Sequence, residues 1–314
     1  MRCVTLATEL VRRGHYVGLI SDEVPTFVEG RVATGGVEIV AAENLSTAEI
    51  LQSWLPDIVV VDGYHLADWV IEAASRQISC VVIDDNHELP VGLAALVVNQ
   101  NPHASTINYP LSGPRYLLGP EYALLRQEVL ELSEKDWTRN SAAVLVAMGG
   151  TDPNQLTVPV VEGLASLEEV AVIDVALGEG HPGWDRIADM SRHSGGKIRN
   201  ANGDLTESFK TVGSAVVGGG STLWELAVLG IPSVAAIVAD NQYEGSRAAM
   251  KIGLTTAVDV RKKEPRLGGI QLVDALGSVL RHPNRYLAMK MAGRSIFDSG
   301  GAGRIAEAME SLSV

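Results

Sequence analysis

The chain has few cysteines and no concentration of positive charge. Cys3 and Cys80 are the only cysteines among 314 residues. Two cysteines are too few for a disulfide framework, and no CxxC or Cys/His cluster indicates zinc. Lys and Arg total 25 against 38 Asp and Glu, which gives a net charge of −13. Because binding to nucleic acid or to anionic membranes depends on basic patches, neither partner is expected.

Long hydrophobic runs are also absent. No apolar run reaches the ~18–20 residues that a membrane-spanning helix needs, so no integral membrane segment is expected. Residues 1–15 lack the apolar core and small-residue cleavage site of a secretory signal. With 46% hydrophobic and 20% charged residues, the composition is typical of a folded protein. We therefore expect a cytoplasmic protein, and at ~100–200 residues per domain its length suggests two domains.

Short, nearly continuous apolar runs alternate with amphipathic helical patterns along the chain. Such runs predict strands buried on both faces of a parallel sheet. The alternation predicts an α/β fold with doubly wound sheets. The charged stretch 126–141 contains no apolar strand run, so it predicts a linker between domains at 1–125 and 142–314. The predicted strands span 16–21, 58–63, 80–85, 95–100, 142–150, 170–177, 214–220 and 233–239.

The chain opens in a helical pattern rather than in a strand. Leu6, Leu10 and Val11 form part of an apolar stripe at helical spacing. In a doubly wound sheet the first strand is usually central, and the loop after it holds ligand. We therefore expect the N-terminal domain to lack its first strand, because the protein begins with a helix or because the sequence starts at an internal methionine.

Glycine accounts for 32 of the 314 residues, about 10% against a usual ~7%. Gly149 and Gly150 end one predicted strand within GGTDP, and residues 218–220 follow another within GGGSTLWE. Glycine lets the backbone approach a ligand closely, and the start of a following helix attracts anions. Ordinary strand–helix turns are the alternative. Neither loop is a GxGxxG or Walker A motif, so a dinucleotide site or P-loop is disfavoured.

Polar residues follow the later strands of the C-terminal domain. Glu225 is placed to accept hydrogen bonds from a ribose diol, or it forms a capping box with Thr222. Asp240, Asn241 and Gln242 follow a strand at its carboxyl end, where ligands bind in open α/β sheets. The alternative is that Asp240 or Asn241 caps the next helix.

The N-terminal domain shows the same arrangement after two of its strands. Asp62, Tyr64, Asp84 and Asp85 are predicted to line one edge of its sheet. Nearby histidines are candidates for acid–base chemistry or simply surface loop residues. These two histidines are His65 and His87, whereas His15, at the opposite end of the sheet, is interpreted as structural.

Several of these motifs, in their order along the chain, resemble the PseG-like family. They are VVDGYHL, VVIDDNHE, VVNQN, YLLGPEYALLRQE, MGGTDPN, GGGSTLWELAVLGIPSV and ADNQ, and GGGSTLWE is shared with the wider MurG-like superfamily. The family contains the UDP-sugar hydrolase of pseudaminic acid biosynthesis, spore-coat polysaccharide proteins and glycosyltransferases. The resemblance implies a GT-B fold of two Rossmann-like domains facing a cleft, with UDP held mainly by the C-terminal one.

The resemblance also implies roles for individual residues. Tyr64 and Asn241 are expected to act on the sugar. Glu225 is expected to hold the ribose, and Gln242 is expected to face sugar or phosphate. No metal or other cofactor is implied, because helix N-termini stabilise the leaving diphosphate. The residues implied near the diphosphate are Gly149, Gly150, Thr151, Gly219, Gly220, Ser221 and Thr222.

The implied reaction is attack of water on the anomeric carbon of a UDP-sugar with release of UDP. The alternatives are transfer of the sugar to an acceptor, and non-catalytic binding of a nucleotide-sugar. The family's catalytic histidine lies in a Gly-x-Gly-His loop just before the segment that matches residues 1–3. Either that loop lies upstream of Met1 in a longer protein, or this chain lacks the base.

Overall fold

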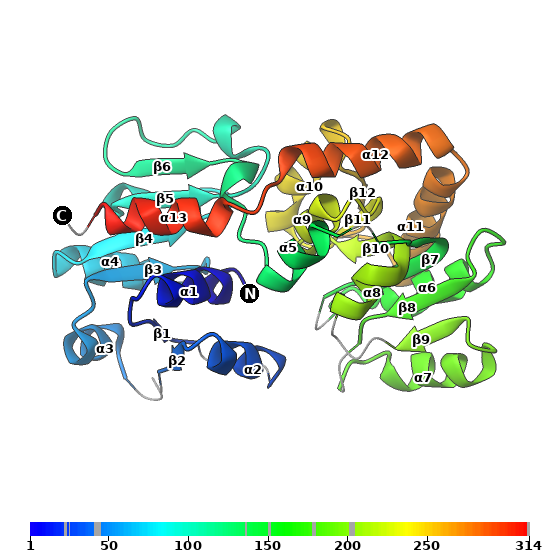
Figure 1. The fold of residues 1–314 in the computed structure, drawn as a ribbon, viewed down its shortest axis with the longest axis horizontal. Coiled ribbons are helices and arrows are strands. Elements are labelled where there is room, and N and C mark those ends of the chain that lie inside the picture. Colours follow the sequence, from blue (N-terminus) through cyan, green and yellow to red (C-terminus); the bar gives the residue numbers. More distant parts are fainter. Residues whose placement is uncertain are drawn as a thin grey trace. The chain divides into compact units, whose positions relative to one another are not determined.

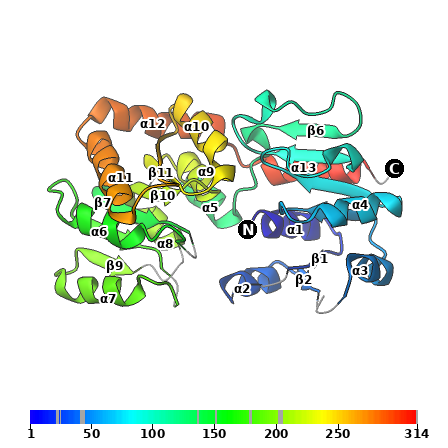
Figure 2. The same cartoon turned by 180° about the vertical axis from the view of Figure 1, so that it is seen from behind.

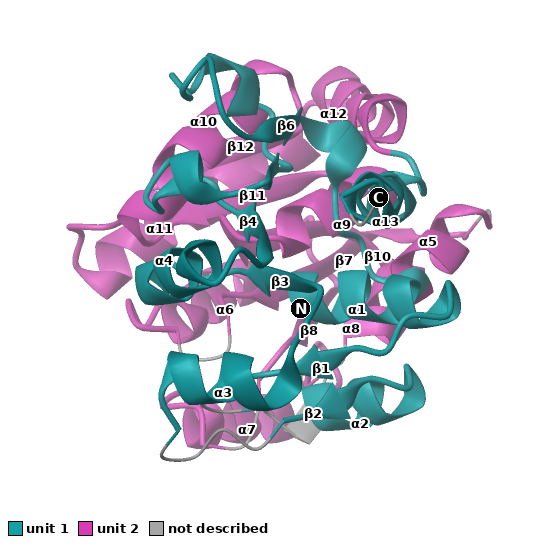
Figure 3. Ribbon diagram, turned by 90° about the vertical axis from the view of Figure 1, so that its left-hand side faces the viewer, with its two compact units in different colours: residues 1–127, 298–314 teal, residues 128–297 magenta. Residues whose placement is uncertain are grey.

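The computed structural model describes the chain except for residues 22–23, 25, 41–44, 136, 150–151, 178–179, 201–204 and 313–314. The chain divides into two compact units, coloured separately in Figure 3. Unit 1 comprises residues 1–127 and 298–314, and unit 2 comprises residues 128–297.

Unit 1 contains two parallel sheets. In the larger sheet β3, β4, β5 and β6 lie side by side in chain order, and β1 pairs with β2 in a separate two-stranded sheet. The first described helix, α1 (Arg2–Arg12), precedes every one of these strands. The strands are β1 (Gly18–Leu19), β2 (Glu38–Ile39), β3 (Ile58–Val61), β4 (Ser79–Ile83), β5 (Leu96–Asn99) and β6 (Arg115–Leu118).

Helices cover both faces of the four-stranded sheet. α1 and α13 (Gly301–Glu310) lie across one face (Figure 1), and α4 (Ala67–Ser75) covers the other (Figure 2). Successive strand residues point to opposite faces. Val81 therefore packs with the α1 and α13 side chains, and Val82 packs with those of α4. The remaining α-helices of unit 1 are α2 (Thr26–Thr34) and α3 (Thr47–Trp54).

The last helix belongs to unit 1 although it ends the chain. Ile305 and Met309, four residues apart on α13, are buried in the same cluster as Leu6 of α1. A side chain at Gly301 would collide with the carbonyl oxygen of Ala123. This division differs from the predicted domain at 142–314, because the apolar face of α13 completes the core of the N-terminal unit.

The predicted linker at 126–141 also differs from the observed structure. It contains α5 (Gln127–Ser133), and residues from 128 onward belong to unit 2. Val129, Leu130 and Leu132 of this helix are buried. The charged residues between them obscured this apolar face in the sequence.

Unit 2 is built on one six-stranded parallel sheet in the order β12-β11-β10-β7-β8-β9. From β7 the chain proceeds to β8 and β9 on one side, and then crosses to β10 on the other side of β7. The strand order therefore reverses between β7 and β10. The strands are β7 (Asn140–Ala147), β8 (Val172–Val175), β9 (Ile198–Asn200), β10 (Val212–Gly218), β11 (Ser233–Ile237) and β12 (Thr255–Asp259).

Helices cover both faces of this sheet as well. α6, α7 and α11 contribute to one core cluster with Val144 and Val216 of the central strands, and α6 and α11 lie together in Figure 2. Elsewhere in unit 2, α9 packs so closely on α12 that a side chain at Gly293 would collide with Ala227. The helices are α6 (Thr157–Ala165), α7 (Trp184–His193), α8 (Leu205–Thr211), α9 (Thr222–Val228), α10 (Tyr243–Lys251), α11 (Pro265–Leu280) and α12 (Pro283–Ile296).

The α/β fold with parallel sheets agrees with the fold class expected from the sequence. Every predicted strand range overlaps an observed strand, whereas β2, β6, β9 and β12 were not predicted. These four strands are short or partly exposed, so they lack the continuous apolar runs that identified the others. No helix within the described residues is both long enough and apolar enough to cross a bilayer.

The close contact at Gly301 provides a stability test. Gly301→Ala places a methyl group against the Ala123 carbonyl, and we expect it to lower the free energy of unfolding by about 1–3 kcal/mol. Gly303→Ala is the matched control on the same helix, because its nearest neighbour would be the Arg13 guanidinium, 3.5 Å away. Urea unfolding of both variants measures the difference. Equal stabilities would contradict the packing of α13 on unit 1.

Candidate functional site

The reversal of strand order places two glycine loops side by side at the carboxyl ends of two central strands of the unit 2 sheet. β7 and β10 are neighbours in register, with Ala147 opposite Val217, so they end at the same level. Gly149 follows β7 with φ +92°, and residues 218–220 end or follow β10. Ligands of open α/β sheets bind in the crevice at such a reversal. Gly150 and Thr151 lie outside the described residues.

The second glycine loop is held against the start of α10. The amide of Gly219 donates to the carbonyl of Ala236 at 2.9 Å, which anchors the loop to β11. A side chain at Gly219 would collide with the hydroxyl of Ser246 and would lie 3.3 Å from Cβ of Gln242. Gly220 has open space where a side chain would be. A side chain at position 219 would therefore require the Ser246 hydroxyl to move away.

Ser246 beneath this loop is a residue that the sequence analysis did not identify. It is 1% exposed, and its hydroxyl makes no hydrogen bond within the part of the chain that the structure describes. Buried hydroxyls are usually hydrogen-bonded. The unbonded hydroxyl of Ser246 therefore indicates that a polar partner is needed below the glycine loop. No pattern in the sequence distinguishes Ser246 from other helical serines.

The start of α9 does not match the predicted capping box. Ser221 is the N-cap, and its side chain makes no capping hydrogen bond, while Thr222 is already the first helical residue. The capping box needs Thr222 at the N-cap, so that alternative is wrong. Glu225 is 7% exposed in the first turn of α9.

Residues 240–242 form a short 3-10 turn, η4, at the carboxyl end of β11. The Asp240 carboxylate pairs with Arg261 at 2.5 Å, and Arg261 also lies over the ring of Tyr243 at 4.4 Å. Hydrogen bonds to Asp259, ahead of those to Asp240, raise the pKa of Arg261. These contacts fix the turn that carries the half-buried Asn241.

Gln242, in the same turn, makes a local hydrogen bond. Its side-chain oxygen accepts from the amide of Val238 at 3.1 Å. This bond positions the turn against the end of β11. The ligand role expected for Gln242 stays a prediction.

A network of charges occupies the carboxyl edge of the unit 1 sheet. Arg2 bonds Asp62 at 2.5 Å and both oxygens of Asp85 at 2.7 Å. The Tyr64 hydroxyl donates to Asp85 at 3.0 Å, and Asn101 donates to it at 2.6 Å. Burial alone lowers the pKa of Arg2, but Asp85 and Asp62 outweigh that effect and raise it. Arg2 therefore remains a cation that organises both carboxylates.

The structure joins residues of the network that the sequence analysis considered separately. Asp62, Tyr64 and Asp85 come together as expected, whereas Arg2 and Asn101 were missed. Arg2 precedes the apolar stripe of α1, and nothing in the pattern indicates that its guanidinium meets the ends of β3 and β4.

Other polar residues of this edge have structural roles. Asp84 is 1% exposed and accepts hydrogen bonds from the backbone amides of His87 and Leu89. Cys3 lies 3.5 Å from Asp62, and burial, followed by that carboxylate, raises the thiol pKa to about 12. Cys3 is therefore protonated at neutral pH and is not an activated nucleophile.

The three histidines considered in the sequence do not converge. His15 pairs with Glu310 of α13 at 3.0 Å, which agrees with its structural interpretation. His65 is exposed, and the ring of His87 lies 5.2 Å from that of Tyr109. Among the described residues no cluster of three or more His, Cys, Asp or Glu side chains suits a metal ion.

No family model matches the chain. A curated relative is the spore coat polysaccharide biosynthesis protein SpsG of Bacillus subtilis, 22% identical over 65% of this chain and 60% of its own length. An uncharacterised protein of Methanocaldococcus jannaschii is 23% identical over 65% of this chain and 45% of its own length. The chain thus spans less than two thirds of the length of these two relatives.

A third curated relative carries a transferase name. It is a UDP-N-acetylglucosamine–N-acetylmuramyl-(pentapeptide) pyrophosphoryl-undecaprenol N-acetylglucosamine transferase of Exiguobacterium. It is 24% identical over 73% of this chain and 67% of its own length. These similarities indicate the wider MurG-like superfamily, and the narrower PseG-like family stays a prediction.

Solved structures of similar fold cover almost the whole chain. MurG of Acinetobacter baumannii has a TM-score of 0.64 at 14% identity, over 99% of this chain and 95% of its own. MnaA of S. aureus, solved with UDP, has a TM-score of 0.70 at 12% identity, over 99% of this chain and 93% of its own. The fold is therefore α/β with parallel sheets, as in GT-B glycosyltransferases.

The contact between Gly219 and Ser246 is testable by a double-mutant cycle. Gly219→Ala forces a methyl group against the Ser246 hydroxyl, and we expect a loss of about 1–3 kcal/mol in the free energy of unfolding. Ser246→Ala removes the colliding oxygen, so the double variant should recover most of that loss. Chemical denaturation of the four proteins measures the coupling. Strict additivity of the two effects would contradict the close approach.

Proposed function

We propose that unit 2 binds a UDP-sugar and that the protein transfers the sugar to an acceptor. The observation that carries this proposal is the pair of glycine loops at the reversal of strand order. Support comes from the transferase relative in Exiguobacterium and from the similar fold of a protein solved with UDP. Each curated relative is matched over only part of its own length. The proposal is therefore made for this chain and not for the full length of any relative.

The site chemistry suits a nucleoside diphosphate. Gly149 and Gly220 have open space where a side chain would be, which leaves room for phosphate oxygens close to the backbone. The chain has a net charge of −13, so local groups, rather than the overall field, must attract the anion. Glu225 is assigned to the ribose hydroxyls, because a carboxylate accepts two hydrogen bonds from a diol.

In the proposed reaction an acceptor hydroxyl attacks the anomeric carbon. A new carbon–oxygen bond forms, the bond from the anomeric carbon to the diphosphate breaks, and UDP leaves with the bonding electrons. The acceptor proton passes to a base. We assign Asn241 of unit 2 to orienting the sugar. The sugar role expected of Tyr64 in unit 1, whose hydroxyl donates to Asp85, stays a prediction. No residue is assigned as the base.

Hydrolysis is the second candidate, favoured by the order of PseG-like motifs along the chain. Water then replaces the acceptor hydroxyl, and the bonds that form and break at the anomeric carbon are otherwise the same. Hydrolysis occurs if only water reaches the anomeric carbon of the bound sugar, and transfer occurs if an acceptor hydroxyl reaches it.

Release of UDP from a panel of UDP-sugars, with and without candidate hydroxyl acceptors, tests this proposal. Transfer predicts that turnover requires an acceptor, whereas turnover with water alone at the same rate would replace transfer by hydrolysis. UDP binding in calorimetry without turnover under either condition would leave only a binding protein. Failure to bind UDP would contradict the proposed function itself.

Glu225→Ala tests the nucleotide site directly. Loss of charge-assisted hydrogen bonds to the ribose should weaken UDP binding by about 1–3 kcal/mol. Glu207→Ala is the control, since Glu207 also lies in the first turn of a unit 2 helix but has a 77% exposed side chain. Calorimetry with UDP measures both affinities. Unchanged affinity in Glu225→Ala, with the fold intact, would remove Glu225 from the site.

A further inference from the structure

The glycine loop after β10 contains a backbone carbonyl without its usual ladder partner. Gly218 lies opposite Ala236 in the parallel pair of β10 and β11, and the amide of Gly219 continues this ladder by donating to Ala236. In the same pattern the Gly219 carbonyl would accept from the amide of Val238. That amide donates instead to the side-chain oxygen of Gln242 at 3.1 Å. Within the described residues the Gly219 carbonyl accepts no hydrogen bond.

The Ser246 hydroxyl beneath this loop is unpaired as well. It lies against the position that a side chain on Gly219 would occupy, and it has no hydrogen-bond partner within the described residues. A buried donor without an acceptor is destabilising. The donor of Ser246 and the acceptor of Gly219 would satisfy each other if the carbonyl turned toward the hydroxyl.

The peptide unit between Gly219 and Gly220 links this carbonyl to an amide of the loop. The Gly220 amide donates to the Gly218 carbonyl at 2.8 Å, which closes a three-residue turn. The carbonyl and the amide of one planar trans peptide unit point in opposite directions. A rotation that turns the Gly219 carbonyl toward Ser246 therefore turns the Gly220 amide away from Ser246. Gly220 is exposed, so the rotated amide faces the open side of the loop.

Gly220 does not need to be glycine in the observed conformation. Nothing lies within 4 Å of the place where its side chain would be, and its φ is outside the left-handed region. Rotation of the preceding peptide changes this φ, as between type I and type II turns, of which type II requires a positive φ. The rotated loop would therefore account for a second glycine directly after Gly219.

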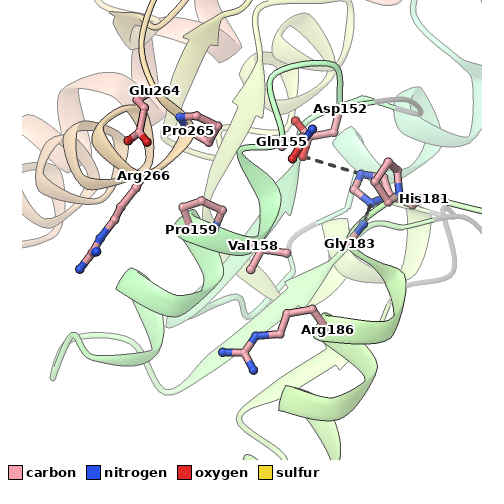
Figure 4. Close-up of a pocket in the computed structure, with 11 residues that line it drawn as sticks. Asp152, Gln155, Val158, Pro159, His181, Gly183, Arg186, Glu264, Pro265 and Arg266 are labelled. Atoms are coloured by element: carbon pink, nitrogen blue, oxygen red, sulfur yellow. Dashed lines mark hydrogen bonds and ion pairs between the residues drawn. The ribbon is translucent and has the colours of Figure 1, made fainter.

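The glycine loop after β7 is braced by a side chain. It ends at Asp152, whose carboxylate accepts the amides of Leu156 at 3.0 Å and Thr157 at 2.8 Å. Figure 4 shows this carboxylate beside His181. In the loop after β10, no side chain among the described residues accepts an amide of residues 218–220. Rotation in that loop therefore breaks only the backbone bond that closes the three-residue turn.

We propose that the peptide between Gly219 and Gly220 turns over when the diphosphate of a UDP-sugar binds, and that Ser246 holds it in the turned position. The Gly219 carbonyl then accepts from the Ser246 hydroxyl. The Gly220 amide donates to a phosphate oxygen in place of the Gly218 carbonyl. The ligand favours the turned loop because only that conformation presents this amide. Ser246 is thus a positioning residue, and its role rests on the proposed binding of UDP.

Ser246→Ala tests this role by separating stability from binding. Because the variant removes an unpaired buried hydroxyl, the urea midpoint of the free protein should stay unchanged or rise. Binding of UDP in calorimetry should weaken about tenfold, because the turned loop loses one hydrogen bond.

Ser214→Ala is the matched control for this variant. Ser214 is also fully buried with a hydroxyl that is unpaired within the described residues, but it lies inside β10. Its substitution should leave the affinity for UDP unchanged. A midpoint lowered further in Ser246→Ala than in Ser214→Ala, or equal UDP affinities of the two variants, would overturn the proposal.

Gly220→Ala tests the rotation from the other end of the peptide. The free protein has space for the methyl group at an ordinary φ, so its urea midpoint should not fall. UDP binding should weaken about tenfold or more, because a positive φ is unfavourable for alanine. A UDP affinity equal to that of the unchanged protein would contradict the rotation.

The amide NMR signal of Gly220, in protein labelled with 15N-glycine, reports the rotation directly. Gly220→Ala assigns this signal. Saturating UDP should shift it in the unchanged protein, and should shift it less in Ser246→Ala, where the turned peptide lacks its partner. Equal shifts in the two proteins would remove Ser246 from the mechanism.

The unchanged protein distinguishes the two ways in which this account can fail. If it does not bind UDP, the proposed function fails and the loop rotation fails with it. If it binds UDP, and Ser246→Ala and Gly220→Ala bind UDP equally well, the proposed function stands and the rotation is overturned.

Discussion

The reversal of strand order beside β7 is the constraint on which the candidate site depends. The chain leaves β7 toward β8 on one side and continues from β10 toward β11 on the other side. No crossover helix therefore covers the carboxyl ends of β7 and β10. Parallel pairing then brings both strand ends to the same level, with Val146 opposite Val216. The glycine loops are therefore neighbours although about 70 residues separate them in sequence.

Close backbone approach keeps these loops in place. A side chain at Gly219 would collide with the Ser246 hydroxyl, and side chains at Gly293 and Gly301 would collide with the backbone of Ala227 and Ala123. At these three positions glycine is used for proximity, whereas Gly149 is needed for its left-handed backbone, with φ +92°. The glycine excess in the composition thus reflects packing as well as a proposed ligand cradle.

Much of the fold was predictable, because strands buried on both faces read as continuous apolar runs. Runs such as 142–150 and 214–220 identified β7 and β10 within a few residues. Strands without that signal, such as β6 and β12, and the return of α13 to unit 1 were not predictable. Their positions depend on tertiary contacts, for example the fit of Ile305 beside Leu6.

The candidate site was only partly predictable for the same reason. Gly219, Gly220 and Asn241 lie at strand ends, where a motif identifies them. Arg2 acquires its meaning only from its contacts with the distant residues Asp62 and Asp85. Periodicity reports which face of an element is buried, but it does not report which polar groups meet.

The most direct test of the central claim is a crystal structure of the protein grown with UDP. The account predicts electron density for the diphosphate at the edge between β7 and β10, in contact with the loops at Gly149 and residues 218–220, and the ribose beside Glu225. A diphosphate bound at any other place on unit 2, with these loops empty, would contradict it.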